Sequence, residues 1–280
     1  MFADDVILYT SAKTVHELNS KLQECTTSVS EWYKGNALSA NNTKSSAMIL
    51  GSKSYLRDMS PDDFTIYLDS QKLKCVENEK YLGLTISNDL SWDEHILGIC
   101  KSMNYYLYML RSLRKILPAS LLMKIYNSYV QSKLDYGISI WGCTTETNLN
   151  KIQRIQNLAA RIITGNFDYI NTRGIDIVES LNIQTIRVRR DYFLCTLMYK
   201  CVNGFAPIYL CDVTMHADIH DHDTRSSRNK NLYVPRPYKE MYKRSFKYKA
   251  SQLWNVLPCY VRNQQSIDCF KREYKKVKGW

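Results

Sequence analysis

The hydrophobic positions of the chain change their period near residue 90. Before that point, short apolar runs bounded by turn-forming residues predict β-strands. Two of these runs are separated by Asp69 and Ser70, which predicts a hairpin that turns at this pair. The predicted strands are 6–10, 47–50, 65–68, 72–76 and 81–86.

One amphipathic helix interrupts these strands. Its apolar residues recur three and four positions apart, which places them on one face of a helix. Thr14 and Glu17 form a capping box at its start, and Gly35 with Asn36 ends it. The apolar positions are Val15, Leu18, Leu22, Cys25, Val29 and Trp32. Residues 1–90 are therefore expected to form a β-sheet packed by one helix.

Helical spacing dominates from Ser91 onward. Ser91 and Glu94 form a second capping box, Pro118 breaks the helix that follows, and Gly165 stops a later one. Further helices are predicted over 119–134, 149–163 and 185–202, then a loop over 216–237 and a partly helical segment over 242–274. The expected fold class is α+β, with three segments at 1–90, 91–165 and 166–280.

Composition narrows the class of protein. The 280 residues are 45% hydrophobic, which suffices for a globular core. No apolar run approaches the ~18 residues that span a bilayer, and the first residues do not resemble a signal peptide. We therefore expect an intracellular protein, nuclear or cytoplasmic, without a membrane partner. Nine cysteines without a CxxC pair favour reduced, mostly buried thiols.

The positive charge is concentrated near the end of the chain. The net charge is +11, and residues 225–280 hold 15 Lys and Arg against 3 acidic residues, a regional charge of +12. Such a block is typical of a surface that binds phosphate backbones. The alternative is a basic face that is merely solvated.

Candidate chemistry lies in the acidic doublet Asp4-Asp5, which follows Phe2-Ala3 and precedes an apolar run. Adjacent carboxylates face opposite ways in a regular strand, so the pair indicates a tight turn. Crowded carboxylates are useful around Mg²⁺, which is held by one or two carboxylates and the oxygens of a substrate phosphate. A plain turn stabilised by local Asp hydrogen bonds is the competing interpretation.

The order of several short motifs resembles the reverse transcriptase of LINE-type (non-LTR) retrotransposons. Each motif is weak alone, but the ordered set covers nearly the whole chain. In sequence they are Phe2-Ala3-Asp4-Asp5, Asn41-Asn42-Thr43-Lys44, Tyr81-Leu82-Gly83, the stretch 90–96, 132–137, Trp141-Gly142, 153–159, His222-Asp223-Thr224-Arg225, Arg244-Ser245-Phe246 and 254–258.

This resemblance implies roles for individual residues. Asp4 would ligate Mg²⁺ with Asp5 as its partner, and Lys44 would approach the phosphates of the incoming nucleotide or protonate pyrophosphate. Tyr81, Leu82 and Gly83 would lie near the primer end. The implied fold is a partial palm over 1–90, thumb-like helices over 91–165 and a helical, basic C-terminal region. The implied partners are an RNA template and a DNA primer.

The resemblance also implies a deficit. In the family, the fingers and the strand that bears another metal-binding aspartate precede the Ala-Asp-Asp turn, and here only Met1 and Phe2 do so. We therefore expect a C-terminal fragment, begun at an internal methionine, that has no polymerase activity by itself. Its oligomeric state stays open.

Two other functions compete with this one. The first is a non-catalytic nucleic-acid-binding module, with phosphate-neutralising cations and stacking aromatics interleaved near the end of the chain; aromatics at such spacing are also typical of a core. Those cations are Lys239, Lys243, Arg244, Lys247 and Lys249, and the aromatics are Tyr238, Tyr242, Phe246, Tyr248, Trp254 and Tyr260.

The second is a metal-binding module. His216, Asp218, His220, Asp221, His222 and Asp223 are ligand types, and Cys195, Cys201 and Cys211 precede them, but no spacing matches a zinc knuckle.

Overall fold

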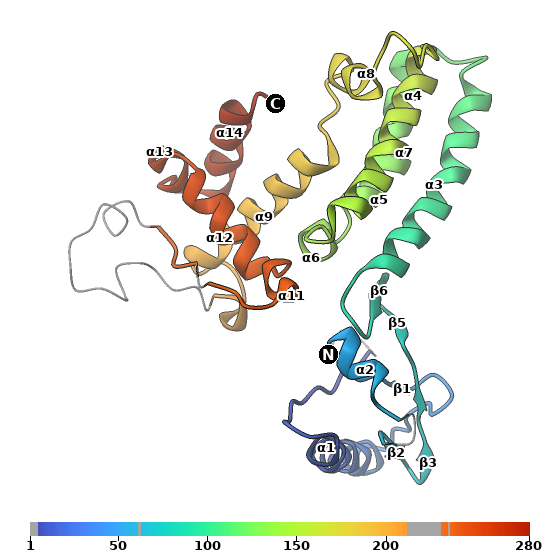
Figure 1. Ribbon diagram of the computed structural model, residues 1–280, viewed down its shortest axis with the longest axis vertical. Coiled ribbons are helices and arrows are strands. Elements are labelled where there is room, and N and C mark those ends of the chain that lie inside the picture. The colour runs from blue at the N-terminus through green and yellow to red at the C-terminus, as the bar shows by residue number, and fades with distance from the viewer. Residues whose placement is uncertain (1–4, 61–62, 212–230, 235) are drawn as a thin grey trace. The chain divides into compact units, whose positions relative to one another are not determined.

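A computed structural model describes residues 5–60, 63–211, 231–234 and 236–280 (Figure 1). The chain forms two compact units, residues 1–95 and 96–280. The first mixes short strands and helices, and the second is helical within its described residues, so the class is α+β as predicted. No described helix combines the length and apolar composition needed to cross a bilayer.

The strands of the first unit form three separate pairs where one sheet was expected. β1 (Ser46–Ala47) pairs in parallel with β4 (Lys74–Cys75). β2 (Tyr67–Leu68) and β3 (Gln71–Lys72) form an antiparallel hairpin that turns at Asp69 and Ser70, as predicted. Both turn residues have positive φ, 49° and 64°, which suits the right-handed twist of a two-residue hairpin.

The third pair corrects a prediction. β5 (Asn78–Tyr81) and β6 (Leu84–Ser87) are antiparallel, and Leu82 and Gly83 form the turn between them. Their φ values are 45° and 79°, so the Tyr-Leu-Gly motif reverses the chain and the single predicted strand 81–86 is wrong.

The predicted strand 6–10 is also wrong. Val6, Ile7, Leu8 and Tyr9 are all exposed and belong to no strand. An apolar run becomes a strand only where a neighbour pairs with its backbone, and among the described residues no strand pairs with this run.

The predicted amphipathic helix is α1 (Val15–Gly35), and Thr14 caps it by accepting a hydrogen bond from the Glu17 amide at 3.2 Å. Its first half packs on a small core formed by Ala47, Ile49, Phe64 and Ile66. The second half departs from the prediction, since Cys25 and Trp32 are exposed. A short helix that the pattern did not reveal, α2 (Lys53–Arg57), adds Leu56 to the same core.

The second unit begins within α3 (Asp93–Leu113), whose Ile96, Met103, Leu107 and Leu110 are buried as the spacing predicts. The next predicted helix is divided into α4 (Ala119–Ile125), a π-helical turn η1 (Tyr126–Gln131) and α5 (Ser132–Asp135). The short α6 (Ile138–Trp141) follows. In Figure 1, α3, α4, α5 and α7 run along one another.

Three helices continue this unit. α7 (Glu146–Thr164) ends where Gly165 adopts the left-handed conformation, with φ of 79°. α8 (Gly174–Ser180) packs on α7, and α9 (Ile186–Val202) begins at Thr185, which caps it.

The C-terminal segment folds around α9. It contains α11 (Glu240–Lys243), α12 (Phe246–Val256), α13 (Cys259–Arg262) and α14 (Ile267–Lys278), after the 3-10 turn η2 (Ile208–Leu210). α12 and α14 pack directly on α9. Their shared core includes Leu194, Met198, Tyr199, Trp254 and Phe270.

All nine cysteines are free thiols, as expected, but most are not fully buried. Cys143, Cys195 and Cys201 are buried, Cys25 and Cys75 are exposed, and the other four are half-buried. The expectation of mostly buried thiols was therefore wrong.

Candidate nucleic-acid interface

The acidic doublet is only partly described. Asp4 lies outside the described residues, and Asp5 is exposed at the start of an extended segment. Carboxylate oxygens are the hard ligands that Mg²⁺ prefers, so the donor set of the doublet fits this ion. The roles of Asp4 and Asp5 stay predictions.

Lys44 lies in a turn built by Asn41. The Oδ1 atom of Asn41 accepts hydrogen bonds from the Thr43 amide at 3.1 Å and the Lys44 amide at 3.3 Å, which is an Asx turn. The Lys44 side chain is exposed, and no acidic residue in the described part of the chain pairs with it. Its ammonium group is thus available to an anionic partner, and the role of Lys44 stays a prediction.

Tyr81, Leu82 and Gly83 form the tip of the β5–β6 hairpin. Leu82 and Gly83 are exposed and Tyr81 is half-buried. The base of this hairpin is held by Ser46, whose hydroxyl donates to Glu79 Oε2 at 2.6 Å. The motif therefore presents a backbone turn to solvent, which is where glycine permits close approach of another chain.

The described residues give little support to the metal-binding module. The predicted ligands between His216 and Asp223 lie outside the described residues, and the described residues contain no group of three or more potential metal ligands. Cys211 donates through its thiol to the Ala206 carbonyl at 3.1 Å. Burial raises the pKa of Cys195 to about 12, so this cysteine stays a neutral thiol, whereas metals bind thiolates.

The basic C-terminal cations are only partly available. Lys239 and Lys243 are exposed, while Arg244, Lys247 and Lys249 are half-buried along α12 and its approach. Lys243 is neutralised by an ion pair with Glu240. Lys239 and Arg244 have no acidic partner in the part of the chain that the structure describes.

The predicted stacking aromatics of this segment divide into two groups. Trp254 is 1% exposed and stacks on Phe270 with ring centroids 6.1 Å apart, so it is a core residue and its predicted stacking role is wrong. Phe246 also packs against this core. Tyr238 and Tyr260 are exposed and keep their rings accessible.

A second aromatic surface, which the sequence interpretation missed, lies on α3. Lys101, Tyr105, Tyr108 and Arg111 are all exposed, and we name these four residues the tyrosine face. Tyr105 and Tyr108 are 68% and 71% exposed. Their spacing of four, three and three places them along one side of the helix, over roughly 15 Å at 1.5 Å per residue. The sequence could have revealed this surface, because these four positions lie away from the side of the helix that carries the buried residues at 96, 103, 107 and 110.

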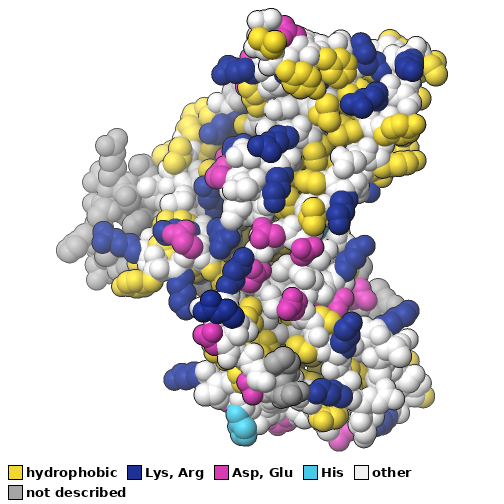
Figure 2. Space-filling view, turned by 45° about the vertical axis from the view of Figure 1, so that its right-hand side comes forward, with side chains coloured by type: hydrophobic (Ala, Val, Ile, Leu, Met, Phe, Trp, Pro, Cys, Tyr) yellow, Lys and Arg dark blue, Asp and Glu magenta, His cyan; other side chains and the backbone are white. Residues whose placement is uncertain are grey.

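Neighbouring contacts extend the tyrosine face toward η1. Tyr106 stacks on Tyr129 with centroids 5.7 Å apart, and Lys133 Nζ lies 4.9 Å from the centre of the Tyr106 ring. Tyr129 is 50% exposed. In Figure 2, Lys and Arg side chains alternate with hydrophobic ones over the upper part of the view. Such alternation suits single-stranded nucleic acid, whose bases stack on aromatic rings while cations neutralise phosphates.

Several curated proteins of Drosophila mobile elements are similar to this chain. The chain is 29% identical over 188 residues to a probable RNA-directed DNA polymerase from transposon BS of Drosophila melanogaster, 66% of this chain and 20% of that protein. The polymerase from mobile element jockey of the same fly is 25% identical over 62% of this chain and 19% of its own length. The corresponding X-element protein is 28% identical over 59% of this chain and 18% of its own length.

The chain thus spans about a fifth of the length of the curated relatives it matches. No family model and no solved structure matches it. Its curated relatives are RNA-directed DNA polymerases of Drosophila transposons and mobile elements, the class of protein that the order of its motifs predicts.

Proposed function

We propose that this chain is a C-terminal part of a retrotransposon RNA-directed DNA polymerase and holds the RNA template and DNA primer of that enzyme. The observation that carries this proposal is the similarity to three such polymerases over 59–66% of the chain. The exposed cations and tyrosines of the helical unit support it, because they match the chemistry of a nucleic-acid backbone and its bases.

Within this proposal, each segment has a part. Residues 1–90 contribute to the palm, residues 91–165 act as the thumb, and residues 166–280 form the basic C-terminal region. Asp4 and Asp5 hold Mg²⁺, which supplies charge stabilisation to the transferred phosphoryl group. Lys44, exposed on its Asx turn, approaches the phosphates of the nucleotide. The exposed tip at Leu82 and Gly83 lies near the primer end.

Binding of a labelled RNA–DNA hybrid by the full chain tests the proposal. The logarithm of the binding constant falls as the logarithm of the salt concentration rises. A variant that no longer neutralises one phosphate makes this fall shallower, by about 0.7–1 in the slope. Lys239 and Arg244, which have no acidic partner in the described residues, are the informative positions, and we expect Lys239→Ala and Arg244→Ala each to reduce this slope. Lys243→Ala is the matched control, because Glu240 already neutralises Lys243. A wild-type affinity that does not respond to salt would refute the proposal.

Primer extension tests the catalytic part. We expect no Mg²⁺-dependent extension by the 280-residue chain alone, because the chain spans only about a fifth of the length of its polymerase relatives and Mg²⁺ needs oxygen ligands beyond the two carboxylates of the doublet. Extension that occurs and is abolished by Asp4→Asn would overturn the inactivity and establish the doublet as catalytic.

A non-catalytic nucleic-acid-binding role is the second candidate, favoured by the tyrosine face. It predicts salt-dependent binding to single strands that Asp4→Asn and Lys44→Ala leave unchanged. An equal loss of hybrid binding in these two variants would favour the polymerase role.

A further inference from the structure

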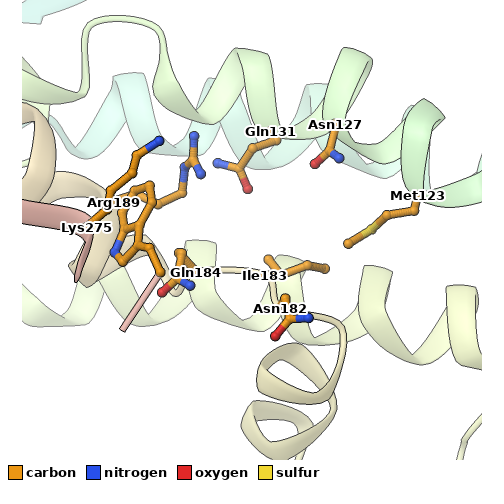
Figure 3. Close-up of a pocket in the computed structure, with 9 residues that line it drawn as sticks. Met123, Asn127, Gln131, Asn182, Ile183, Gln184, Arg189 and Lys275 are labelled. Atoms are coloured by element: carbon orange, nitrogen blue, oxygen red, sulfur yellow. The ribbon is translucent and has the colours of Figure 1, made fainter. Parts of the chain in front are cut away.

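A cavity of about 440 Å³ that is partly open to solvent lies in the helical unit, away from the acidic doublet in sequence. Its walls come from η1, from residues 182–184 between α8 and α9, and from α9 and α14. Figure 3 shows Asn127 and Gln131 on one side and Asn182 and Gln184 on the other, with Met123 at one end and Arg189 and Lys275 at the opposite end. The volume lies in the range of small-molecule sites.

Three of the four amide side chains at this cavity are free to bind a ligand. Asn127, Asn182 and Gln184 form no side-chain hydrogen bond with any residue that the structure describes. Gln131, by contrast, accepts from the Tyr126 hydroxyl and donates to Asp135 at 2.9 Å. The cavity therefore offers both donors and acceptors, and its fourth amide is held in place by the core.

The opposite end is cationic and aromatic. Two cations lie near the Trp280 indole, with Lys275 Nζ 5.3 Å and Arg189 Cζ 5.7 Å from the ring centre. The indole Nε1 atom is buried and has no hydrogen-bond partner among the described residues. This atom is closed off from solvent, so it does not face the open volume of the pocket, and the two cations are the groups at this end that can meet an anion.

The charges around this end favour an anion. Arg189 is held by Asp135, whereas Lys275 has no acidic partner in the described chain. Lys278 lies in the same last turn of α14, where Lys276 is paired with Glu273, and no acidic side chain of the described residues lines the cavity. A phosphate group at this end therefore meets the Lys275 ammonium group, which has no acidic partner among the described residues, and the Arg189 guanidinium, which Asp135 neutralises.

We propose that this cavity binds one nucleotide, with its phosphate at Lys275 and Arg189 and its base edge at the amides of Asn127, Asn182 and Gln184. Asn and Gln amides match adenine with two hydrogen bonds, so adenine is the preferred base. This inference deepens the proposed function and rests on it. The nucleotide is either free or an unstacked member of a single strand, and the test separates these sources.

The test compares a ten-nucleotide labelled oligoadenylate with an abasic strand of equal length, both titrated by fluorescence anisotropy with the full chain. We expect Asn127→Ala combined with Gln184→Ala to lower the preference for oligoadenylate over the abasic strand three- to tenfold and to leave abasic binding unchanged. Gln265→Ala, at an exposed amide outside the cavity, is the matched control. Lys275→Ala should weaken both strands.

Competition by AMP identifies the source. If AMP displaces oligoadenylate from the wild type but not from the double variant, the cavity binds a free nucleotide. If AMP displaces nothing and the double variant still lowers the strand preference, the cavity binds a nucleotide of the strand. A preference that is the same in the wild type and the double variant overturns the pocket and leaves the proposed function standing. Absence of binding to both strands overturns the proposed function, and the pocket with it.

Discussion

Arg189 on α9 donates from Nε to Oδ1 of Asp135 on α5 at 2.7 Å, and a second guanidinium nitrogen pairs with the other carboxylate oxygen. Gln131 donates to the same Oδ1 at 2.9 Å. Both charged side chains are 19% exposed. This contact joins two helices that are far apart in sequence. Because Arg189 also lines the cavity, the same ion pair holds a residue of the candidate binding site in place.

We expect Asp135→Ala to lower the free energy of unfolding by about 3 kcal/mol, because it leaves the Arg189 charge mostly buried without its partner. Urea unfolding followed by circular dichroism measures this loss. Glu146→Ala is the matched control, since Glu146 pairs with Arg187 but is 65% exposed. Its cost should not exceed about 1 kcal/mol. Equal losses in the two variants would contradict the prediction.

Alanine substitutions at Gly165 and Gly204 distinguish the cost of backbone strain from the cost of a close contact. Both have left-handed φ, 79° and 71°, so alanine at either costs about 1–2 kcal/mol. At Gly165, a Cβ would also come within 1.9 Å of Arg114 Nη2, whereas nothing lies within 4 Å at Gly204.

Arg114 can move away, but then it loses its position over the Phe167 ring, 5.8 Å from the centroid. We expect Gly165→Ala to cost about 0.5–1 kcal/mol more than Gly204→Ala in urea unfolding. This excess should vanish in an Arg114→Ala background. An excess that survives there would show that the close approach to Arg114 does not cause it.

Thiol labelling should follow exposure. Cys25 is exposed, whereas Cys195 is 1% exposed, and burial raises the pKa of its thiol to about 12. With iodoacetamide at pH 8 and native conditions, mass spectrometry of tryptic peptides should find Cys25 modified and Cys195 unmodified, because the thiolate is the reactive form. Both should be modified in urea. Rapid labelling of native Cys195 would refute its buried position.

The free energy of unfolding at alkaline pH should depend on the ionisation of Tyr126. Burial raises the pKa of Tyr126 to about 12 from an ordinary value of 10. The folded state then keeps a proton that the unfolded state loses, so this contribution is fully present below pH 10 and is lost between pH 10 and about 12. Its slope is about 1.4 kcal/mol per pH unit.

Tyr126→Phe should remove this contribution. Urea midpoints measured from pH 9 to 11.5 should fall less steeply with pH in the variant than in the wild type. At neutral pH the variant should have a free energy of unfolding about 1 kcal/mol lower, because Gln156 loses its hydrogen bond to the Tyr126 hydroxyl. Parallel pH profiles for the two proteins would contradict the prediction.

The tyrosine face should bind bases. Tyr105→Ala combined with Tyr108→Ala should weaken binding of single-stranded oligonucleotide at least tenfold in anisotropy titrations, since base–aromatic stacking contributes about 1–3 kcal/mol per base. Tyr209→Ala, at a 79% exposed tyrosine outside this face, is the control. Equal affinities in the double variant and the control would rule out the tyrosine face as a stacking surface.

The sequence by itself determined most of the long helices and several of their ends. The spacing of three and four residues between apolar positions in α1, α3 and α7, the cap at Thr14 and the stop at Gly165 depend on contacts within a few residues, so local pattern predicts them. The order of short motifs likewise indicated the class of the curated relatives.

Only the tertiary structure decided which strands pair and which side chains meet. Among the described residues no strand pairs with the apolar run after Asp5, the Tyr-Leu-Gly motif became a turn, and Trp254 entered a core that α12 shares with α9 and α14. Strand pairing and burial depend on partners that are distant in sequence, which periodicity does not specify. The cavity between η1, α9 and α14 arises in the same way, because Asn127, Gln184 and Lys275 come together only when η1, α14 and the segment before α9 pack.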